Sequence, residues 1–399
     1  MLRSLRLENF RSFADATIPF EPLTVLVGLN GAGKSNVLDG LKVLQGLALE
    51  HDLPAALDGE HAGGYQTWQG IRGGSAEAIR HGHTSFVLES RWSVAEAKLR
   101  HTAEIFVFKG ESAFVTRPQF KHEKLEDEQS GSILWRTELV NHPDDEDTTV
   151  YRALFAGTQT LSHLNSSSSL LNDQPGDSLT SQLAETIANL QVLNVTPERM
   201  RDWVPRNAKE IGLAGENLSA IIARRKHDAA RLEGLQDWIA ELIGDEGRGL
   251  DVLEAPTGDV MLQLTDASGG RVTARSMSDG TLRFLGQIVA IEELKPGRTL
   301  FMEEPDAALH PARIHLLAQK LEAETAPGRD KQVIITTHSP QFLNWLSRDR
   351  WNGVVLLWRD PETHATRATR VTDLPALAQM PPSTRLGDLL ATEWLERAT

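Results

Sequence analysis

The chain has 399 residues, with 41 basic and 55 acidic side chains and a formal net charge of −14. It contains no cysteine, which excludes disulfides, thiolate zinc sites, iron–sulfur clusters and a cysteine nucleophile. No segment has the apolar length of a signal peptide or of a membrane span, so the sequence predicts a cytoplasmic protein. At about 150 residues per domain, the length predicts two or three folding units.

The N-terminal segment predicts strands that lead into a glycine loop and a helix. Residues 23–27 are apolar and β-branched and stop at Gly28, a pattern typical of a buried parallel strand. Apolar residues then recur at spacings of three and four from Val37 to Leu47, which predicts an amphipathic helix.

The middle of the chain has a mixed pattern. Residues 84–88 and 103–108 have the composition and alternation of strands. Residues 178–245 are predicted to be mostly helical, with one apolar stripe over residues 218–242 that is too short for a long coiled coil.

The last third of the chain returns to alternating strands and helices. Residues 260–264 predict a strand and residues 282–294 a helix, and three further strands are predicted at residues 299–302, 333–337 and 353–358. Short buried strands that alternate with helices indicate an α/β fold with a parallel sheet covered on both faces.

A complete phosphate-binding motif follows the first of these buried strands. Residues 28–35 read GLNGAGKS and fit the G-x-x-x-x-G-K-[ST] pattern between a strand and a helix. The glycines let backbone N–H groups close around phosphates, and the helix N-terminus adds its positive dipole end. Lys34 is expected to reach the β- and γ-phosphates and Ser35 to bind Mg²⁺. The sequence therefore predicts a nucleotide-binding protein.

Two adjacent acids, Glu303 and Glu304, follow the apolar strand at residues 299–302. The first acid can hold Mg²⁺ through water, and the second can orient or deprotonate an attacking water. Acids after a strand are also common where a helix begins, so the pair gains its meaning from the phosphate-binding loop.

His338 and Ser278 extend the set of candidate residues. His338 is expected at the tip of the next strand, where it can bind a γ-phosphate or simply cap the following helix. Ser278 and Gly280 precede a helix and form either a second anion site or an ordinary helix cap. Two phosphate sites with one lysine loop indicate that the second site serves another subunit's nucleotide.

Together these motifs resemble the ABC-type ATPases of the RecF and SMC class, and in detail the shorter OLD-like and RecF-like bacterial "AAA family" ATPases that lack a Toprim domain. The matching segments occur in the family's order and are residues 7–13, 28–36, 278–285, 303–305, 309–311 and 337–340. The resemblance implies an ABC-type P-loop ATPase head with a mixed β and helical insert. It places the ATPase core in residues 1–50 and 271–399, and the remaining β-subdomain strands with the helical insert or lid in residues 51–270.

The resemblance also implies ATP and Mg²⁺ as cofactors and a role for each motif residue. Glu304 would be the catalytic carboxylate and His338 the switch histidine, while Ser35 and Glu303 would hold the metal. The implied nucleotide-binding residues are Asn30, Gly31, Ala32, Gly33, Lys34, Ser35, Asn36, Ser278 and Gly280.

Three further features follow from the resemblance. Residues 306–311 would form the D-loop, and the Q-loop glutamine would be Gln69, or else Gln66. ABC cassettes commonly have aspartate at the position of Glu303, although Glu-Glu-Pro is usual in the OLD-like branch.

The implied function is an ATP-hydrolysing homodimeric switch whose ATP sites are shared between subunits. It would act on DNA or on a separate nuclease-like effector, in DNA repair or anti-phage defence. The alternatives are a self-sufficient ATP-regulated nuclease and a nucleotide-gated scaffold that does not hydrolyse ATP. Nucleic acid is an expected partner and a membrane is not. The one nuclease-like E-x-K match, residues 293–295, is interpreted as chance, and the short C-terminal remainder indicates a chain without nuclease activity of its own.

Two segments are candidate contact surfaces. Arg224, Arg225, Lys226 and Arg231 form the densest basic run, interpreted as a solvated helix face or as a nucleic-acid contact. Residues 386–397 predict a helix with an apolar stripe, which either packs on the protein's own sheet or binds a partner.

Overall fold

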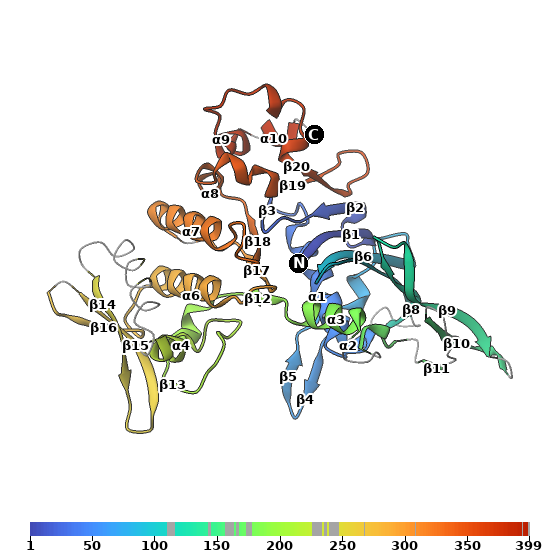
Figure 1. The fold of residues 1–399 in the computed structure, drawn as a ribbon, viewed down its shortest axis with the longest axis horizontal. Coiled ribbons are helices and arrows are strands. Elements are labelled where there is room, and N and C mark those ends of the chain that lie inside the picture. Colours follow the sequence, from blue (N-terminus) through green and yellow to red (C-terminus); the bar gives the residue numbers. More distant parts are fainter. Residues whose placement is uncertain are drawn as a thin grey trace.

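The structure is a computed structural model, which describes residues 1–109, 116–142, 145–155, 163–164, 167–172, 178–225, 234, 238, 247–266, 268–307, 309–392 and 394–397. A central sheet lies between an antiparallel sheet built largely from the first part of the chain and a smaller sheet from residues 204–273 (Figure 1). The C-terminal residues form a further lobe, at the top of the figure.

The central sheet has six strands in the order β12-β17-β18-β3-β19-β20. The strands are β12 (Gln191–Leu193), β17 (Thr299–Glu303), β18 (Gln332–Thr337), β3 (Leu23–Val27), β19 (Val354–Arg359) and β20 (Thr366–Arg370). The first five run parallel and β20 pairs antiparallel with β19. The strands predicted from the short apolar runs are confirmed.

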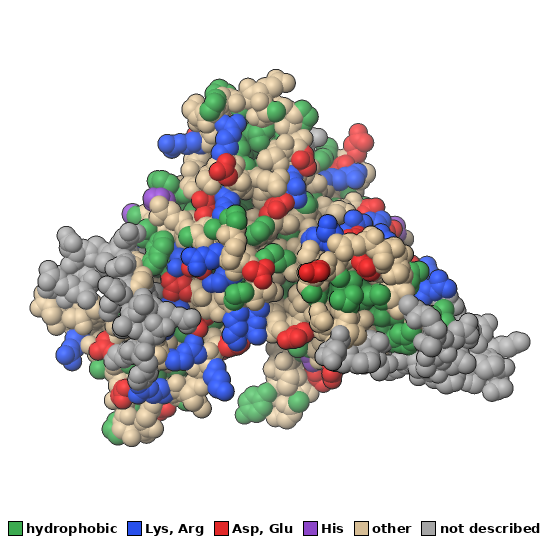
Figure 2. Space-filling model, in the orientation of Figure 1, with side chains coloured by type: hydrophobic (Ala, Val, Ile, Leu, Met, Phe, Trp, Pro, Cys, Tyr) green, Lys and Arg blue, Asp and Glu red, His purple; other side chains and the backbone are tan. Residues whose placement is uncertain are grey.

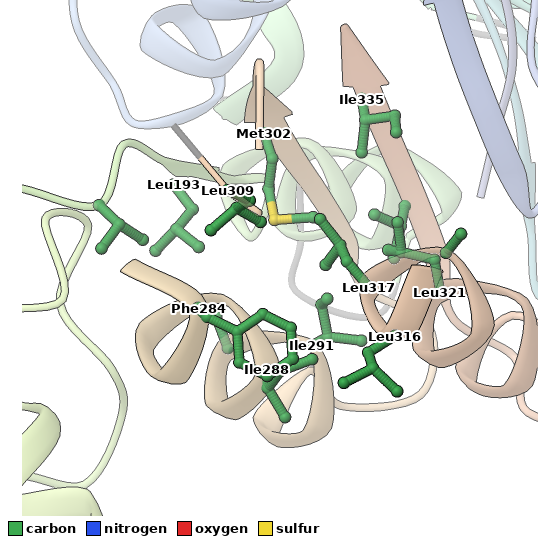
Figure 3. Packing of buried hydrophobic residues seen from close by; sticks show 14 of the residues in the cluster. Leu193, Phe284, Ile288, Ile291, Met302, Leu309, Leu316, Leu317, Leu321 and Ile335 are labelled. Carbon is green, nitrogen blue, oxygen red and sulfur yellow. The ribbon is translucent and has the colours of Figure 1, made fainter. Parts of the chain in front are cut away.

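Helices cover both faces of this sheet. Alternate residues of a strand point to opposite faces, and every residue of β3 and β18 is buried, so both faces must be covered. Met302 and Ile335 pack against α6 (Asp279–Glu293) and α7 (Pro311–Glu324), as Figure 3 shows. Phe301 and Ile334 belong to the other hydrophobic core, which contains the buried face of α1 (Lys34–Ala48). The predicted parallel sheet with helices on both faces is thus confirmed.

The antiparallel sheet has eight strands in the order β11-β10-β9-β8-β7-β6-β1-β2. They are β1 (Leu2–Phe10), β2 (Phe13–Pro19), β6 (Ser85–Val94), β7 (Ala97–Lys109), β8 (Thr116–Asp127), β9 (Ser132–His142), β10 (Asp145–Phe155) and β11 (His163–Leu164). Every second residue of β6 is buried, so one face packs on the same core as α1, α2 (Leu53–Asp58) and α3 (Leu179–Ala188).

The third sheet contains β14 (Gly247–Glu254), β15 (Asp259–Asp266), β13 (Val204–Pro205) and β16 (Arg271–Thr273), and α4 (Leu218–Arg225) packs beside it. The prediction that residues 178–245 are mostly helical is wrong between α3 and α4. There the chain forms β12, a 3₁₀ turn at Pro197–Met200 and β13, because Val192 and Leu193 complete the central sheet and prolines interrupt helix formation. Most of the predicted stripe beyond Arg225 lies outside the described residues.

The C-terminal stripe packs on the protein itself. Leu390 of α9 (Leu386–Ala391) and Leu395 of α10 (Trp394–Arg397) are buried in one core with Phe342 of α8 (Pro340–Asn344). This confirms the internal-packing alternative for residues 386–397.

In the part of the chain that the structure describes, no helix is both long and apolar enough to cross a membrane.

Candidate nucleotide-binding site

The phosphate-binding loop joins β3 to α1, as predicted. Three of its glycines have positive φ: 145° at Gly28, 79° at Gly31 and 106° at Gly33. A Cβ atom on Gly28 would lie 2.1 Å from the carbonyl oxygen of Leu357 in β19, so only glycine allows this close approach of two backbones.

Lys34 lies inside the loop. Its Nζ donates to the carbonyls of Gly28, at 2.7 Å, and Leu29, at 3.2 Å, and only 6% of the residue is exposed. Burial lowers the pKa of Lys34, and the nearby carboxylate of Glu304 opposes this shift. The two carbonyls hold the ammonium in the loop, where a bound phosphate would receive its hydrogen bonds.

Side chains distant in sequence hydrogen-bond to the backbone of the phosphate-binding loop. Thr366 Oγ1 is 2.9 Å from the carbonyl oxygen of Ala32 and 2.7 Å from Ser12 Oγ, which also accepts from Asn36 Nδ2 at 2.8 Å. Arg359 Nε donates to the carbonyl of Gly31 at 3.0 Å. The β1–β2 turn and the β19–β20 hairpin therefore fix the loop conformation together.

Thr366→Val should weaken ATP binding. Valine keeps the shape of threonine but removes both bonds of a fully buried hydroxyl, which leaves the Ala32 carbonyl without this donor. The expected loss is about 1–3 kcal/mol, or roughly 5- to 150-fold in Kd if it falls entirely on the loop. Titration with a fluorescent ATP analogue measures it, and an unchanged Kd would show that the loop does not depend on this support.

The acids and the histidine meet at the carboxyl edge of the central sheet. β17 and β18 run in register, with Glu303 opposite Thr336, so Glu304 and His338 both follow strand ends. His338 Nδ1 lies 3.2 Å from Glu304 Oε1. The structure therefore brings together the predicted catalytic carboxylate and the predicted switch histidine.

Glu304 is held in an unusual backbone conformation. Its φ is +43°, which is uncommon for a residue with a side chain. Its N–H donates to the carbonyl oxygen of Thr336 at 3.0 Å and lies 3.1 Å from the threonine Oγ1. These contacts to β18 fix where the carboxylate leaves the strand, and such strain is common at functional sites.

The turn after Glu304 contains a buried acid. Asp306 is 6% exposed and accepts from Thr337 Oγ1 at 2.7 Å, while its other carboxylate oxygen has no hydrogen-bond partner among the described residues. Burial raises the pKa of Asp306. Gln287 Nε2 of α6 donates to the carbonyl of Pro305 at 2.7 Å. This bond ties the turn to the helix that begins at Ser278 and Gly280, the predicted second anion site, which is called the signature below.

Ser278 is the N-cap of α6. Its Oγ accepts from the N–H of Thr281 at 3.2 Å and lies 2.8 Å from Thr281 Oγ1. The helix-cap alternative predicted for Ser278 is therefore correct, and the residue is exposed. Among the described contacts, no hydrogen bond joins Ser278 or Gly280 to the phosphate-binding loop of the same chain, so the predicted role in another subunit's site stays a prediction.

The loop before Ser278 is held by an arginine that the sequence did not single out for this role. Arg201 Nη1 donates to the carbonyls of Ala274, Arg275 and Met277 at 2.9, 2.9 and 2.8 Å, and its Nη2 pairs with Asp279. No short-range pattern links Arg201 to a loop more than 70 positions away.

Arg201→Ala should reduce ATP hydrolysis while ATP binding at Lys34 persists. The change frees three carbonyls and the Asp279 carboxylate, so the loop that presents Ser278 loses its fixed conformation. The expected decrease in kcat is about tenfold or more. Steady-state hydrolysis and analogue binding measure the two effects separately, and a parallel loss of both would contradict the assignment.

Two further predictions concern the Q-loop glutamine and the E-x-K match at residues 293–295. The choice of Q-loop glutamine stays a prediction, since Gln66 in β5 (Tyr65–Trp68) and Gln69 directly after it are both exposed. The interpretation of the E-x-K match as chance stays a prediction. Glu293 ends α6, as expected, and its carboxylate pairs with Arg224 and Arg225.

The same ion pairs correct both interpretations of the basic run at one position, Arg225. Arg225 is only 3% exposed and binds Glu292 and Glu293, at 2.5 and 2.9 Å, so it is neither a solvated face nor a free cation for nucleic acid. Two carboxylates on α6 satisfy it, and charge counting along the chain could not show that. On the face drawn in Figure 2, acidic and basic side chains are interspersed. Lys226 and Arg231 lie outside the described residues.

A cavity of about 530 Å³ opens beside Asn36. It is lined by Arg11, Ser12, Asn36, Glu77, Ile79, Arg80, His81, Arg359 and His364. A second cavity of about 500 Å³ lies against Leu29, Asn30, Ala32 and Trp358. The first is rich in cations and continues from the loop, which suits a polyphosphate ligand.

The residues present also fit a magnesium ion. Among the described residues no three His, Asp or Glu side chains cluster in a way that would hold a metal. Mg²⁺ needs no such cluster in a phosphate site, because it keeps several waters and takes one or two protein ligands plus phosphate oxygens. Ser35 in the first turn of α1 and Glu303 at the end of β17 are the predicted protein ligands, and this role stays a prediction.

Comparison with known proteins agrees with this geometry. Residues 23–344 match the family AAA_21, described as "AAA domain, putative AbiEii toxin, Type IV TA system". The Old nuclease of Escherichia phage P2 is 23% identical over 363 residues, which cover 86% of this chain and 57% of the nuclease. The chain therefore spans little more than half the length of that relative.

Two shorter sequence matches are to proteins of the same kind. The Rad50 ATPase of Sulfolobus acidocaldarius, a DNA double-strand break repair protein, is 48% identical over 42 residues, or 10% of this chain and 5% of Rad50. The OLD nuclease of Thermus scotoductus is 44% identical over 46 residues, or 12% and 9%.

One solved structure supports the fold. The SMC head bound to the C-winged helix domain of ScpA aligns with a TM-score of 0.51 at 14% identity and covers 92% of this chain and 97% of the head. The chain thus belongs to the AAA_21 family, and its fold is that of an ABC-type, SMC-like ATPase head related to the OLD nucleases.

Proposed function

We propose that this protein binds and hydrolyses ATP with Mg²⁺. The observation that carries the proposal is the meeting of three parts at one sheet edge: the loop around Lys34, the carboxylate of Glu304 and the imidazole of His338. Phosphoryl transfer depends mainly on positioning and on charge stabilisation, and these side chains supply both.

Each group has a distinct role in this reaction. Lys34 and the backbone N–H groups of the loop hold the β- and γ-phosphates, and Ser35 with Glu303 holds the metal. Glu304 accepts a hydrogen bond from the attacking water and takes its proton, while His338 beside it senses the γ-phosphate. Bound Mg²⁺ neutralises charge that develops on the phosphate oxygens.

We further propose that ATP joins two copies with two-fold symmetry. Ser278 and Gly280 begin α6 at an exposed edge, with no hydrogen bond to their own phosphate-binding loop among the described contacts. A helix N-terminus with a capping serine binds an anion well, so the signature of one copy can complete the phosphate site of the other.

The ATP-driven pair would act on DNA or on a separate effector in repair or defence. The similarity to Old nuclease and Rad50 supports this class of role. A self-sufficient nuclease gains no support from residues 293–295, whose carboxylate is taken up by arginines. A scaffold that only binds ATP would not need the Glu304–His338 pair.

Phosphate release by the purified chain tests the proposal. Hydrolysis should require Mg²⁺, stop in EDTA and resume when Mg²⁺ is restored in excess. Absence of hydrolysis with ATP binding intact would support the scaffold. In the same preparations plasmid DNA should stay intact with Mg²⁺ or Mn²⁺, and cleavage that is lost on changing an acid outside the ATP site would establish the nuclease alternative.

A further inference from the structure

Arg313 lies beside the predicted signature. It belongs to the first turn of α7, and its Nη2 makes a long hydrogen bond of 3.5 Å to Thr281 Oγ1 in the first turn of α6. Thr281 Oγ1 is in turn 2.8 Å from Ser278 Oγ. One hydroxyl therefore connects the signature serine to a guanidinium on the neighbouring helix.

The charge of Arg313 has no ion-pair partner among the described residues. Burial lowers the pKa of Arg313, and no acidic side chain opposes that shift. Within the described ranges, no carboxylate lies at ion-pair distance from it. The nearest acid of the signature, Asp279, is already paired with Arg201. A half-buried guanidinium without a counter-charge is costly, so an anion from outside the chain would stabilise it.

We propose that Arg313 binds the γ-phosphate of the ATP held by a second copy of this chain, next to Ser278 and the N-terminus of α6. The proposal rests on the proposed ATP-joined pair. In such a pair, the anion that reaches Ser278 is the phosphate end of the partner's nucleotide. Most of the guanidinium's five N–H donors are available for it, since among the described contacts Arg313 makes one hydrogen bond, through Nη2.

Two other roles are distinguishable. Arg313 could act on its own copy's nucleotide, but its contact is to the signature helix and not to the phosphate-binding loop. It could also be a brace for Thr281 alone, in which case glutamine would replace it, because an amide N–H can donate to the same hydroxyl without a charge.

The first test compares Glu304→Gln with the double variant Glu304→Gln, Arg313→Gln. Binding of a fluorescent ATP analogue by the separate copies should be unchanged, while ATP-driven pairing should weaken about 10- to 100-fold. Arg275→Gln is the matched control, because this exposed arginine flanks the same signature and lies 3.6 Å from Asp202. Pairing by the double variant equal to that by Glu304→Gln would overturn the inference.

The second test locates the site of action. A mixture of Arg313→Gln with Lys34→Ala contains pairs in which one intact Lys34 site faces one intact Arg313. Hydrolysis should rise above that of either variant alone, to the level that the mixed pairs of wild type with Lys34→Ala add beyond the wild-type pairs. Failure to rise, when those mixed wild-type pairs are active, would place Arg313 on its own copy's nucleotide and overturn the inference. If Glu304→Gln itself does not pair with ATP, the proposed pair fails before Arg313 is tested.

Discussion

Glu304→Gln should retain ATP binding and lose almost all turnover, with kcat reduced by about 10²- to 10³-fold. Glutamine has the size and shape of glutamate, so the contacts of the Glu304 N–H with Thr336 remain. What is lost is the carboxylate that lies 3.2 Å from His338 and would accept the proton of the attacking water.

Two measurements separate these effects. Phosphate release under saturating ATP reports kcat, and fluorescent-analogue titration reports binding. Glu198→Gln is a suitable control, because Glu198 is exposed in the 3₁₀ turn at Pro197–Met200. Wild-type turnover by Glu304→Gln would refute its role as catalytic carboxylate and favour another base.

Lys34→Ala should abolish detectable ATP binding at micromolar ATP, with a loss of at least about 2–3 kcal/mol from the missing charge-assisted bonds. The ammonium is the cation at the centre of the loop, held by the carbonyls of Gly28 and Leu29. Without the ammonium, the partial negative charge of these carbonyl oxygens would repel the phosphates of a bound nucleotide.

Fold and binding must be measured together for this variant. The thermal unfolding midpoint should change little, because the described hydrogen bonds of the Lys34 ammonium go to its own loop. Lys42→Ala on the same helix is the control. Binding by Lys34→Ala that matches wild type would mean that the loop does not hold the nucleotide through this residue.

The chemistry of the loop could be predicted from sequence because its parts are adjacent. Residues 28–35 specify strand, glycine turn and helix within a short segment, and the structure has them in that form. Glu304 and His338 were also predictable, since each follows an apolar strand and parallel strands end at one edge. The division of the chain at residues 50 and 270 stays a prediction.

The supporting contacts could not be predicted, because they join distant positions. Thr366 and Ser12 are 354 positions apart, and Arg201 and Asp279 are 78 apart. Periodicity and motif spacing report only local structure. The same limit explains the wrong interpretation of Arg225, whose carboxylate partners come from another helix, and the excess of helix assigned to residues 189–217.

The central proposal, that ATP joins two copies through Ser278, is tested directly by light scattering on Glu304→Gln. The molar mass should increase towards that of a pair when ATP and Mg²⁺ are added, or a constitutive pair should change its shape. Adding Ser278→Arg, which puts a bulky side chain at the exposed cap, should prevent the response while analogue binding at Lys34 persists. Mass and shape that ATP leaves unchanged, in protein that demonstrably binds it, would contradict the account.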